Sequence, residues 1–529
     1  MKIVRKVYGY RLIFGYLGVF LFFVGIITLL PLSFLIFYPT ENSEAYSFLI
    51  PGVSSLIVGL LLWQFLIARK ERQQLGKFQD SIILVSLYIL SIFVGSVPFM
   101  LRGVFSSGSG GTNFLNALFE STSGYTATGL TVFDFNQDLP GYHLFTIYRS
   151  LLLLCGGVGL VLIVTSTISD RYGLKLYTAE GHNDKLMPNL AKSARLILLI
   201  YLGYILLGTL SYFFFGGMEL FDAFNHSIAA VATGGFSTRE NGIPEIIEQG
   251  GVNSLTGIPV NGVAINITSV ILMILGATNF VIHLFLFKGK IKNLIKDCEV
   301  RFFLLMCIIF IPIFCISIYF DDKTPTLLTR NLLDGTYLFF STITTTGFMT
   351  VNQITSFGQG VLLLAIIMMI VGGSLGSTAG GVKQYRIYLC FKSFYWGIRD
   401  RLSPKSKVYP HKITHLGQTR EVKGDEINEA QGYLLLYVVV MLAGGIIISV
   451  MANGYGDFYA SNCIFEFVSA LSGTGLSVGI TGNVVLPEFN NAIIKIVLII
   501  GMFAGRLEIN CIYFAFYRGA RDILRKETV

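Results

Sequence analysis

Charged residues are scarce in this 529-residue chain, and their scarcity excludes most soluble folds. Only 13% of the residues are charged, whereas 53% are hydrophobic, and the mean hydropathy is +0.67. A soluble protein of this length would carry about 25% charged residues. Long apolar runs recur along the chain, and a run of about 18 residues is long enough to span a bilayer as a helix. We therefore expect an all-α polytopic membrane protein.

Cysteine and histidine are also sparse, which limits disulfide and metal chemistry. The seven Cys are odd in number and lie mostly inside apolar runs, so a disulfide framework is not indicated, and no pair of them has metal-ligand spacing. Of the six His, only His411 and His415 share a helical spacing, and we interpret both as part of a solvated basic loop.

Clustered catalytic side chains are a further absence. A membrane-embedded enzyme, one alternative function, needs a nucleophile, base or metal ligands grouped at membrane depth. The candidates Glu120, His226 and Glu466 fall in three separate segments, at positions that we take to be unequal offsets, and form no such group in the sequence. The sequence therefore does not predict an enzyme.

What the chain does contain is a series of long apolar segments. The first is too long for a secretory signal and is not followed by a small-residue cleavage site, so we expect it to be retained. The ten segments are 12–38, 47–68, 80–101, 142–168, 193–216, 260–287, 302–320, 358–391, 430–451 and 490–516.

Most Lys and Arg residues lie in one set of the intervening segments, and these basic segments alternate with the others after every second span. The positive-inside rule then places both termini in the cytoplasm and the other connections outside. The net charge of +8 thus reflects loops near anionic lipid, and no nucleic-acid partner is implied. The basic segments are 1–11, 69–79, 169–192, 288–301, 383–429 and 517–529.

The outer segments contain a fourfold repeat: "STSGYTATGLTV", "IAAVATGGFSTR", "STITTTGFMTVN" and "SALSGTGLSVGI". Aligned on one Gly, the four share a large apolar residue after it, small residues six and twelve positions before it, and Asn or Asp thirteen before it. The aligned Gly are Gly129, Gly235, Gly347 and Gly475, and the Asx residues are Asn116, Asp222, Asp334 and Asn462.

Each repeat predicts a short helix followed by an extended loop between two spans. Asx is a favoured helix N-cap, and the eight or nine residues after it make a helix of about 13 Å, roughly half a bilayer. Non-helical backbone at membrane depth is tolerated only where it is buried or lines a water-filled cavity. Four such loops around one axis would form a ring of carbonyl oxygens of the kind that binds K⁺ in a selectivity filter.

Potassium is therefore the expected ion, and no organic cofactor is expected in the chain. The predicted filter residues are Ala127, Thr128, Gly129, Thr233, Gly234, Gly235, Thr345, Thr346, Gly347, Gly473, Thr474 and Gly475.

These loops, together with "GGSLGSTAGGVKQYRI", "KGKIKNLIKDCEVRF" and "GRLEI", resemble the Trk/Ktr/HKT superfamily of potassium transport proteins, especially its bacterial TrkH-type subunits, over nearly the whole chain. The resemblance implies four joined pore repeats around one pore, two extra N-terminal helices, a homodimer in the cell (inner) membrane, and a cytoplasmic nucleotide-binding regulatory subunit. Some sodium-permeable relatives have Ser where this chain has Gly129, so the resemblance implies potassium preference.

Two further segments carry functional hypotheses. Arg506 falls in the middle of the last apolar segment, where an Arg is costly and marks a functional site; the resemblance places it in the pore below the filter. The alternative is a buried ion pair with Glu508 or another acid.

The run "GGSLGSTAGGVK", residues 372–383, should interrupt the second span of the third repeat, and the resemblance implies an intramembrane gate there. Alternatives are small-xxx-small helix packing or a phosphate-binding loop, whose Gly-Lys-Ser/Thr ending is absent. Lys383 would begin the basic cytoplasmic segment. The predicted gate residues are Gly372, Gly373, Gly376, Gly380, Gly381 and Arg506.

The predicted function is a potassium channel or transporter subunit for uptake. Alternatives are a symporter coupled to sodium or protons, and a secondary transporter of an organic solute, which would not need the same loop four times. The predicted organisation is 1–78 two N-terminal helices, 79–170, 190–290, 298–392 and 430–518 four pore repeats, 393–429 a basic cytoplasmic linker, and 519–529 a cytoplasmic tail.

Overall fold

The computed structural model describes residues 6–7, 9–68, 71–72, 79–105, 112–160, 162, 190–320, 328–404, 409–453, 459–481 and 487–524. The predicted basic segments at 1–11 and 169–192 fall mostly outside these residues. The predicted domain boundaries stay a prediction, although the helices below follow their order.

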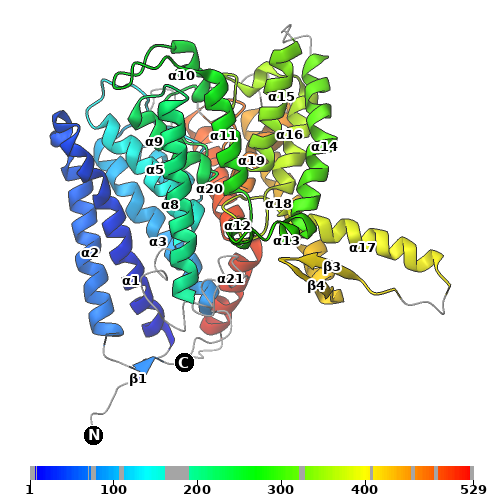
Figure 1. The fold of residues 1–529 in the computed structure, drawn as a ribbon. Helices are drawn as coiled ribbons and strands as arrows, with labels where there is room; N and C mark the ends of the chain where they lie inside the picture. Colours follow the sequence, from blue (N-terminus) through cyan, green and yellow to red (C-terminus); the bar gives the residue numbers. More distant parts are fainter. Residues whose placement is uncertain are drawn as a thin grey trace.

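Long apolar helices form the body of the molecule (Figure 1). Among the described residues, seven helices are long and apolar enough to span a bilayer, or eight if one bent pair counts as a span. This confirms the polytopic, all-helical membrane fold. The helices are α1 (Gly9–Leu29, continued by η1, Leu30–Ile36), α2 (Tyr46–Leu66), α3 (Gln79–Arg102), α8 (Leu190–Phe214), α14 (Cys298–Tyr319), α18 (Gly424–Ala452), α20 (Glu488–Arg506), and the bent pair α11 (Gly262–Gly276) and α12 (Phe280–Phe287).

Two predicted spans are shorter than expected. α5 (Tyr142–Val158) and α16 (Gln359–Val371) have 17 and 13 residues, about 26 and 20 Å at 1.5 Å per residue. Both stop at a Gly with positive φ, Gly159 at 97° and Gly372 at 67°. A left-handed Gly ends a helix because its backbone cannot continue the helical turn.

A short helix precedes each of the four aligned loops, as the repeat predicted: α4 (Asn113–Tyr125), α9 (Leu220–Val231), α15 (Leu328–Ile343) and α19 (Ala460–Ser472). They have 12 to 16 residues, so the predicted eight or nine was too few.

The error arose because the shared Asx residues were taken as N-caps. Thr112 caps α4 by accepting from the Leu115 N–H, while Glu219 and Tyr459 occupy the N-cap positions of α9 and α19. The predicted Asx caps are all inside these helices: Asn116, Asp222, Asp334 and Asn462.

The other elements lie around this body. α17 projects sideways from the bundle beside the β3–β4 hairpin (Figure 1). The predicted span 358–391 is therefore not one continuous helix, because residues 372–383 interrupt it and 384–391 form the start of α17. Strands β1 and β2 pair in parallel and β3 and β4 antiparallel. These elements are η2 (Pro39–Glu44), α10 (Ile243–Gln249), α13 (Ile291–Lys296), η3 (Ile354–Ser356), α17 (Gln384–Leu402), α21 (Ile509–Leu524), β1 (Lys6–Val7), β2 (Glu71–Arg72), β3 (Lys412–His415) and β4 (Gln418–Glu421).

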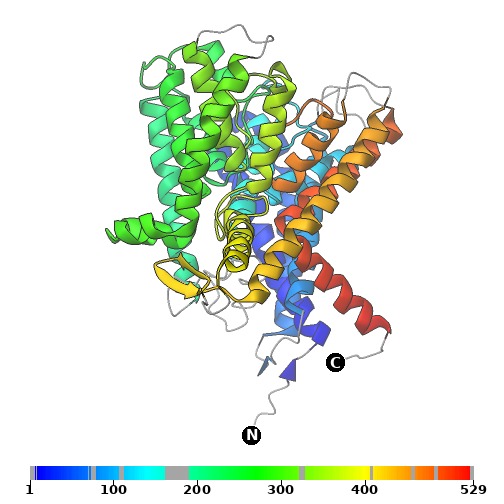
Figure 2. The ribbon, with the colours of Figure 1, turned by 90° about the vertical axis from the view of Figure 1, so that its right-hand side faces the viewer.

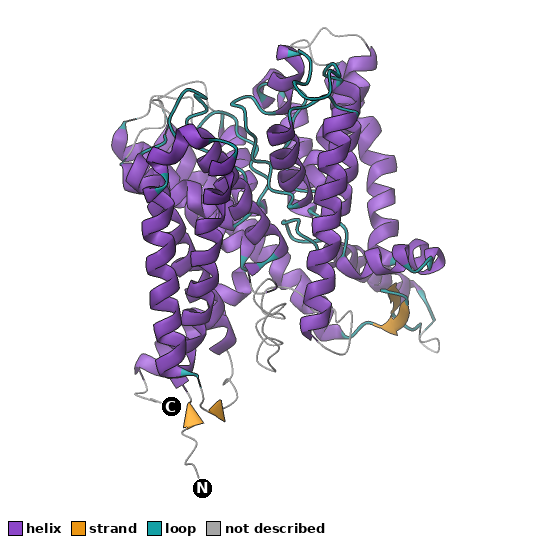
Figure 3. Cartoon of the chain, turned by 60° about the vertical axis from the view of Figure 1, so that its left-hand side comes forward, coloured by secondary structure: helices purple, strands orange, loops and turns teal. Residues whose placement is uncertain are grey.

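The apolar core surrounds a non-helical centre. One buried cluster joins α1, α2 and α3 to α5, a second surrounds α8 and α9, and a third joins α14 through α20. Figure 3 shows loops running through the interior between these helices, and Figure 2 shows α18, α20 and α21 along one side of the body. The loops that follow the short helices therefore lie inside the protein, where the candidate site is found.

Candidate functional site

The four aligned loops adopt the same backbone conformation. The shared Gly has positive φ in every loop, at 94° for Gly129, 67° for Gly235, 86° for Gly347 and 81° for Gly475. The residue two positions earlier also has positive φ, a conformation that a side chain rarely tolerates. These earlier residues are Ala127 at 53°, Thr233 at 51°, Thr345 at 51° and Gly473 at 72°. The conformation is strained in the three repeats where the residue is not Gly, which indicates that the surrounding structure holds these loops in place.

The loops close into a ring. A Cβ placed on the shared Gly of any repeat would lie only 1.9–2.1 Å from a backbone carbonyl oxygen of the next repeat. The pairs are Gly129 with Gly234 (2.1 Å), Gly235 with Thr346 (2.1 Å), Gly347 with Thr474 (1.9 Å) and Gly475 with Thr128 (2.1 Å). The order runs through all four repeats and returns to the first. The predicted filter residues therefore lie together, and glycine is required because the neighbouring carbonyl occupies the place of a side chain.

One backbone hydrogen bond anchors every loop to its short helix. The N–H just before the shared Gly donates to the carbonyl five residues earlier, at 2.9–3.0 Å in each case. Hydroxyl pairs add to it in three loops: Thr126 with Thr128, Thr344 with Thr346, and Ser472 with Thr474, at 2.7–2.9 Å. The second repeat has Ala232 and Gly234 at the corresponding positions and lacks this hydroxyl pair, so the backbone hydrogen bond alone makes this link in its loop.

Buried polar side chains hold the segment that follows each loop. In the first repeat, the Glu120 carboxylate accepts from Thr131 Oγ1 at 2.9 Å and Val132 N–H at 3.0 Å, and pairs with Arg149 Nε at 2.6 Å. In the fourth, Glu466 accepts from Ser477 Oγ at 2.8 Å and Val478 N–H at 2.9 Å. Both acids lie nine residues before the shared Gly, so they are equivalent members of the repeat.

The two middle repeats use the Asx position as well. His226, also nine residues before the Gly, contacts Ser237 Oγ at 2.9 Å. Asp222 accepts from Thr238 Oγ1 at 2.7 Å, and Asp334 accepts from Thr350 Oγ1 at 2.6 Å. Glu120, His226 and Glu466 all lie nine residues before the shared Gly, so the expectation that their offsets are unequal is wrong. This equal spacing is the sequence signal for their shared role.

A small cavity of about 40 Å³ lies at the end of the ring where the short helices finish. The C-terminal end of a helix carries partial negative charge, so the ends of α4 and α19 favour a cation there. The lining residues are Thr126, Ala127, Ser472 and Gly473 from the loops, residues 376–381, Lys383, Gly505, Arg506 and Glu508.

Residues 372–383 form a non-helical segment between α16 and α17, as predicted. Because none of it is helical, the small-xxx-small packing alternative is excluded. Gly380 N–H donates to Thr345 Oγ1 at 2.7 Å, and a Cβ on Gly380 would lie 1.8 Å from the Ser472 carbonyl oxygen. This segment therefore contacts two filter loops directly.

Thr378 fixes the same segment to the second repeat. Its hydroxyl lies 2.8 Å from the Gly276 carbonyl oxygen, 3.2 Å from that of Val231 and 3.0 Å from Thr233 Oγ1. With Gly380, it bridges three of the four loops from below. We call residues 372–383 the crossing segment.

Arg506 lies at the last residue of α20, where that helix breaks before α21, and not in the middle of a continuous span as predicted. Its guanidinium donates to the Gly157 carbonyl oxygen at 3.0 Å and to that of Thr378 at 3.4 Å. Glu508 instead pairs with Arg386 at 2.8 Å. The alternative of an Arg506–Glu508 ion pair is therefore wrong.

Lys383 also lies in the cavity. Its ammonium donates to the Ala379 carbonyl oxygen, inside the crossing segment. The prediction that Lys383 begins the cytoplasmic segment is wrong, because α17 starts one residue later and only its far end leaves the bundle. Two cationic side chains thus face the space beneath the ring.

The second repeat also contains a break that was not predicted. α11 and α12 meet at an angle of 110°, across residues 277–279. The predicted continuous span 260–287 is therefore wrong. Asn279 caps α12 by accepting from Val281 N–H and donates to the Leu375 carbonyl oxygen at 2.6 Å. The bend thus supports the crossing segment.

Comparisons with known proteins agree with this architecture. A family model described as TrkH, a cation transport protein, matches residues 47–519. An uncharacterized cation transporter of Methanocaldococcus jannaschii is 30% identical over 497 residues, 93% of this chain and 92% of that protein. The Trk system potassium uptake protein TrkH of Escherichia coli is 30% identical over 470 residues, 86% of this chain and 88% of that protein.

The crystal structure of the potassium transporter TrkH from Vibrio parahaemolyticus has the same fold. It superposes with a TM-score of 0.77 at 22% identity, covering 96% of this chain and 98% of that one. These relatives are transporters, in agreement with the prediction that the chain is not an enzyme. The chain therefore belongs to the TrkH family of cation transport proteins.

Proposed function

We propose that this protein is the potassium-selective pore subunit of an uptake system in the cell (inner) membrane. The observation that carries the proposal is the closed ring of four loops in which each glycine abuts the carbonyl of the next repeat. Carbonyl oxygens in such a ring replace the hydration shell of K⁺. The names of the relatives from Escherichia coli and Vibrio parahaemolyticus, a potassium uptake protein and a potassium transporter, support the same ion.

The proposed orientation places the ring toward the outside and both termini in the cytoplasm. The support is the distribution of Lys and Arg, which concentrates in alternate connections. K⁺ would enter at the Glu120 and Glu466 side of the ring, pass the four loops, and reach the cavity beside Arg506 and Lys383.

The proposed gate is residues 372–381 of the crossing segment. It bridges the loops through Thr378 and Gly380, and left-handed Gly372, Gly376 and Gly381 let its backbone change conformation at little steric cost. A pore of this kind conducts when the segment moves aside.

The proposed partners are a second copy of the chain and a cytoplasmic nucleotide-binding regulatory subunit. α17 offers a route for regulation because it continues directly from the crossing segment and projects from the bundle. Movement of a partner bound to α17 would pull on Lys383 and its neighbours.

The test is rubidium and potassium flux into liposomes that contain the purified protein, with sodium as competitor. We expect rubidium and potassium to enter and sodium to compete poorly. Gly432→Ala on α18 is a matched control, because a Cβ there meets nothing within 4 Å. Equal uptake of sodium and potassium would contradict potassium selectivity. If none of the tested cations enters the liposomes, the proposed pore is wrong.

A further inference from the structure

The β3–β4 hairpin is fixed to the first turn of α14, in the part of the chain that joins the third and fourth repeats. Its two-residue turn has positive φ at Leu416, 48°, and at Gly417, 75°. Leu416 N–H donates to Asp297 Oδ2 at 2.7 Å. The turn therefore brings the end of β3, at His415, against the N-terminus of α14.

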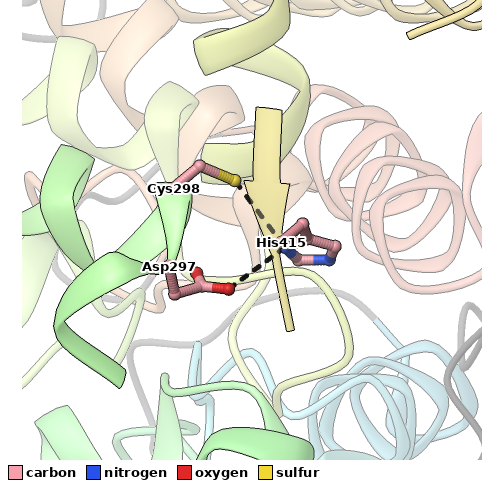
Figure 4. A group of neighbouring side chains, drawn as sticks. All are labelled: Asp297, Cys298 and His415. Carbon is pink, nitrogen blue, oxygen red and sulfur yellow. Dashed lines mark hydrogen bonds and ion pairs between the residues drawn. The ribbon is translucent and has the colours of Figure 1, made fainter. Parts of the chain in front are cut away.

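Three side chains with metal-binding atoms converge at this contact (Figure 4). His415 Nδ1 lies 3.5 Å from Asp297 Oδ2 and 3.7 Å from Cys298 Sγ, and the three donor atoms all lie within 4.8 Å of one another. Solvent reaches little of them, since the side chains of Asp297 and His415 are 0% and 9% exposed and Cys298 is 3% exposed. The expected solvated position of His415 is therefore wrong.

Two of the three separations, 3.5 Å and 3.7 Å, lie close to the edges of a tetrahedral zinc site, and the separation between the Asp297 and Cys298 donor atoms is within 4.8 Å. With Zn–S near 2.3 Å and Zn–N and Zn–O near 2.0–2.2 Å, ligand atoms lie about 3.4–3.6 Å apart. A direct histidine–carboxylate hydrogen bond is shorter, at about 2.7–3.2 Å. We propose that Asp297, Cys298 and His415 bind one Zn²⁺ ion, with a water molecule in the fourth position.

Neighbouring groups orient the ligands as metal sites require. Asp297 Oδ1 accepts from Glu299 N–H at 2.9 Å, which caps α14, while Oδ2 accepts from Leu416. Each carboxylate oxygen has two lone pairs, so Oδ2 keeps one for a metal. The Tyr385 ring lies 4.8 Å from the His415 ring, measured between centroids, and limits its rotation.

Without a metal, the same residues form an ion pair. Zn²⁺ would take the place of the Nδ1 proton and of the thiol proton, and both protons would leave to solvent. The metal-bound state can be told from the metal-free state because only the former contains a metal–thiolate bond.

The site is one residue from a contact with the crossing segment. Glu299 Oε1 accepts from Leu375 N–H at 2.7 Å. A metal that ties the hairpin to α14 would therefore hold Glu299, and with it the crossing segment, in the position beneath the ring. This consequence rests on the proposed function: Zn²⁺ should lower potassium flux.

The binding test uses the full-length protein in detergent, stripped with a chelator and titrated with Zn²⁺ and with Co²⁺ as a spectroscopic probe. We expect one Zn²⁺ per chain and a thiolate-to-cobalt charge-transfer band. Cys298→Ser should abolish the band, and His415→Ala should weaken Zn²⁺ binding by at least about tenfold. Matched controls are Cys307→Ser on the same helix and His411→Ala in the same connection, which should bind as the unchanged protein does.

Failure to bind Zn²⁺ stoichiometrically would overturn the site, as would a cobalt band that survives Cys298→Ser. Flux in liposomes is measured separately on the same variants. If Zn²⁺ binds through Cys298 but leaves flux unchanged, the coupling to the crossing segment is wrong. If the protein transports no potassium, rubidium or sodium in liposomes, the proposed function is wrong. The Zn²⁺ titration still shows whether Asp297, Cys298 and His415 bind the metal.

Discussion

The ring and the region beneath it differ in symmetry. In the ring, the shared Gly and the residue two positions before it have positive φ in all four loops, and the same backbone hydrogen bond anchors each loop to its short helix. That bond joins a Thr to a Ser in three repeats and Gly234 to Ala229 in the second. Beneath the ring, the second span of each repeat also ends early or breaks, but each does so differently. α5 ends at Gly159, three residues separate α11 from α12, twelve separate α16 from α17, and two separate α20 from α21. A ring that surrounds an ion needs equal distances from all sides, whereas an obstruction can come from one side.

The first prediction tests the symmetry of the ring and has the largest expected effect. Replacing Gly129, Gly235, Gly347 or Gly475 with Ser places a Cβ within 1.9–2.1 Å of the next carbonyl oxygen. Strain of about 1–3 kcal/mol at such a position corresponds to roughly a five- to hundredfold change in an equilibrium constant. We expect each variant to lose potassium over sodium discrimination by a similar factor, measured as permeability ratios in liposomes.

Gly432→Ala serves as the control for this series, because that glycine lies in open space. Unchanged permeability ratios in all four Ser variants would contradict the filter. A loss of potassium over sodium discrimination in only one or two of the four variants would contradict the equivalence of the loops.

The second prediction tests the asymmetry beneath the ring. Deleting Gly376 to Ala379 removes the part of the crossing segment that carries Thr378 and its three contacts. Flux should rise several-fold and depend less on a regulatory partner, while the permeability ratio stays unchanged because the ring is intact. Folded protein with unchanged flux and regulation would show that the gate lies elsewhere.

The third prediction concerns the charge in the cavity. Arg506 holds the Thr378 and Gly157 carbonyls, and its positive charge opposes a cation leaving the ring. Arg506→Ala should raise conductance or change the apparent potassium affinity, and Arg506→Lys should remain closer to the unchanged protein. Thermal unfolding of both variants shows whether a change in conductance comes from loss of the positive charge or from destabilisation of the protein. A folded Ala variant with unaltered conductance and affinity would remove Arg506 from the permeation path.

The fourth and smallest effect concerns one hydroxyl. Thr378→Val keeps the shape of the side chain but removes its hydrogen bonds, each of which contributes about 0.5–1.5 kcal/mol. Thr378→Ser keeps them. Thr378→Val should therefore raise potassium flux modestly, as the deletion of Gly376 to Ala379 should do more strongly. Thr378→Ser should leave the flux nearly unchanged. Equal flux in the Val and Ser variants would mean that these bonds do not hold the segment closed.

The parts of the site that could be predicted from the sequence are those set by local chemistry. Gly129 and its equivalents are recognisable because only glycine fits against a neighbouring carbonyl, and the glycines from Gly372 onward end a helix. The polar run that contains Thr345 and Thr346 is likewise explained by its position inside the protein, where it forms part of the ring.

The rest depended on contacts between distant segments. The bend at residues 277–279 lies between two apolar helices and carries only a short polar signal. Lys383 looks like the start of a basic loop, yet the fold of the crossing segment turns it into the cavity. Asp297 and His415 are far apart in the sequence, so their meeting with Cys298 follows from the hairpin and not from any spacing.

The most direct test of the ring is to locate the ion. Crystals grown with rubidium in place of potassium should show an anomalous peak on the axis between the Thr128, Gly234, Thr346 and Thr474 carbonyls. A shift of that peak or its loss in Gly347→Ser would tie it to the loops. A structure of the unchanged protein in rubidium with no peak on this axis would contradict the account.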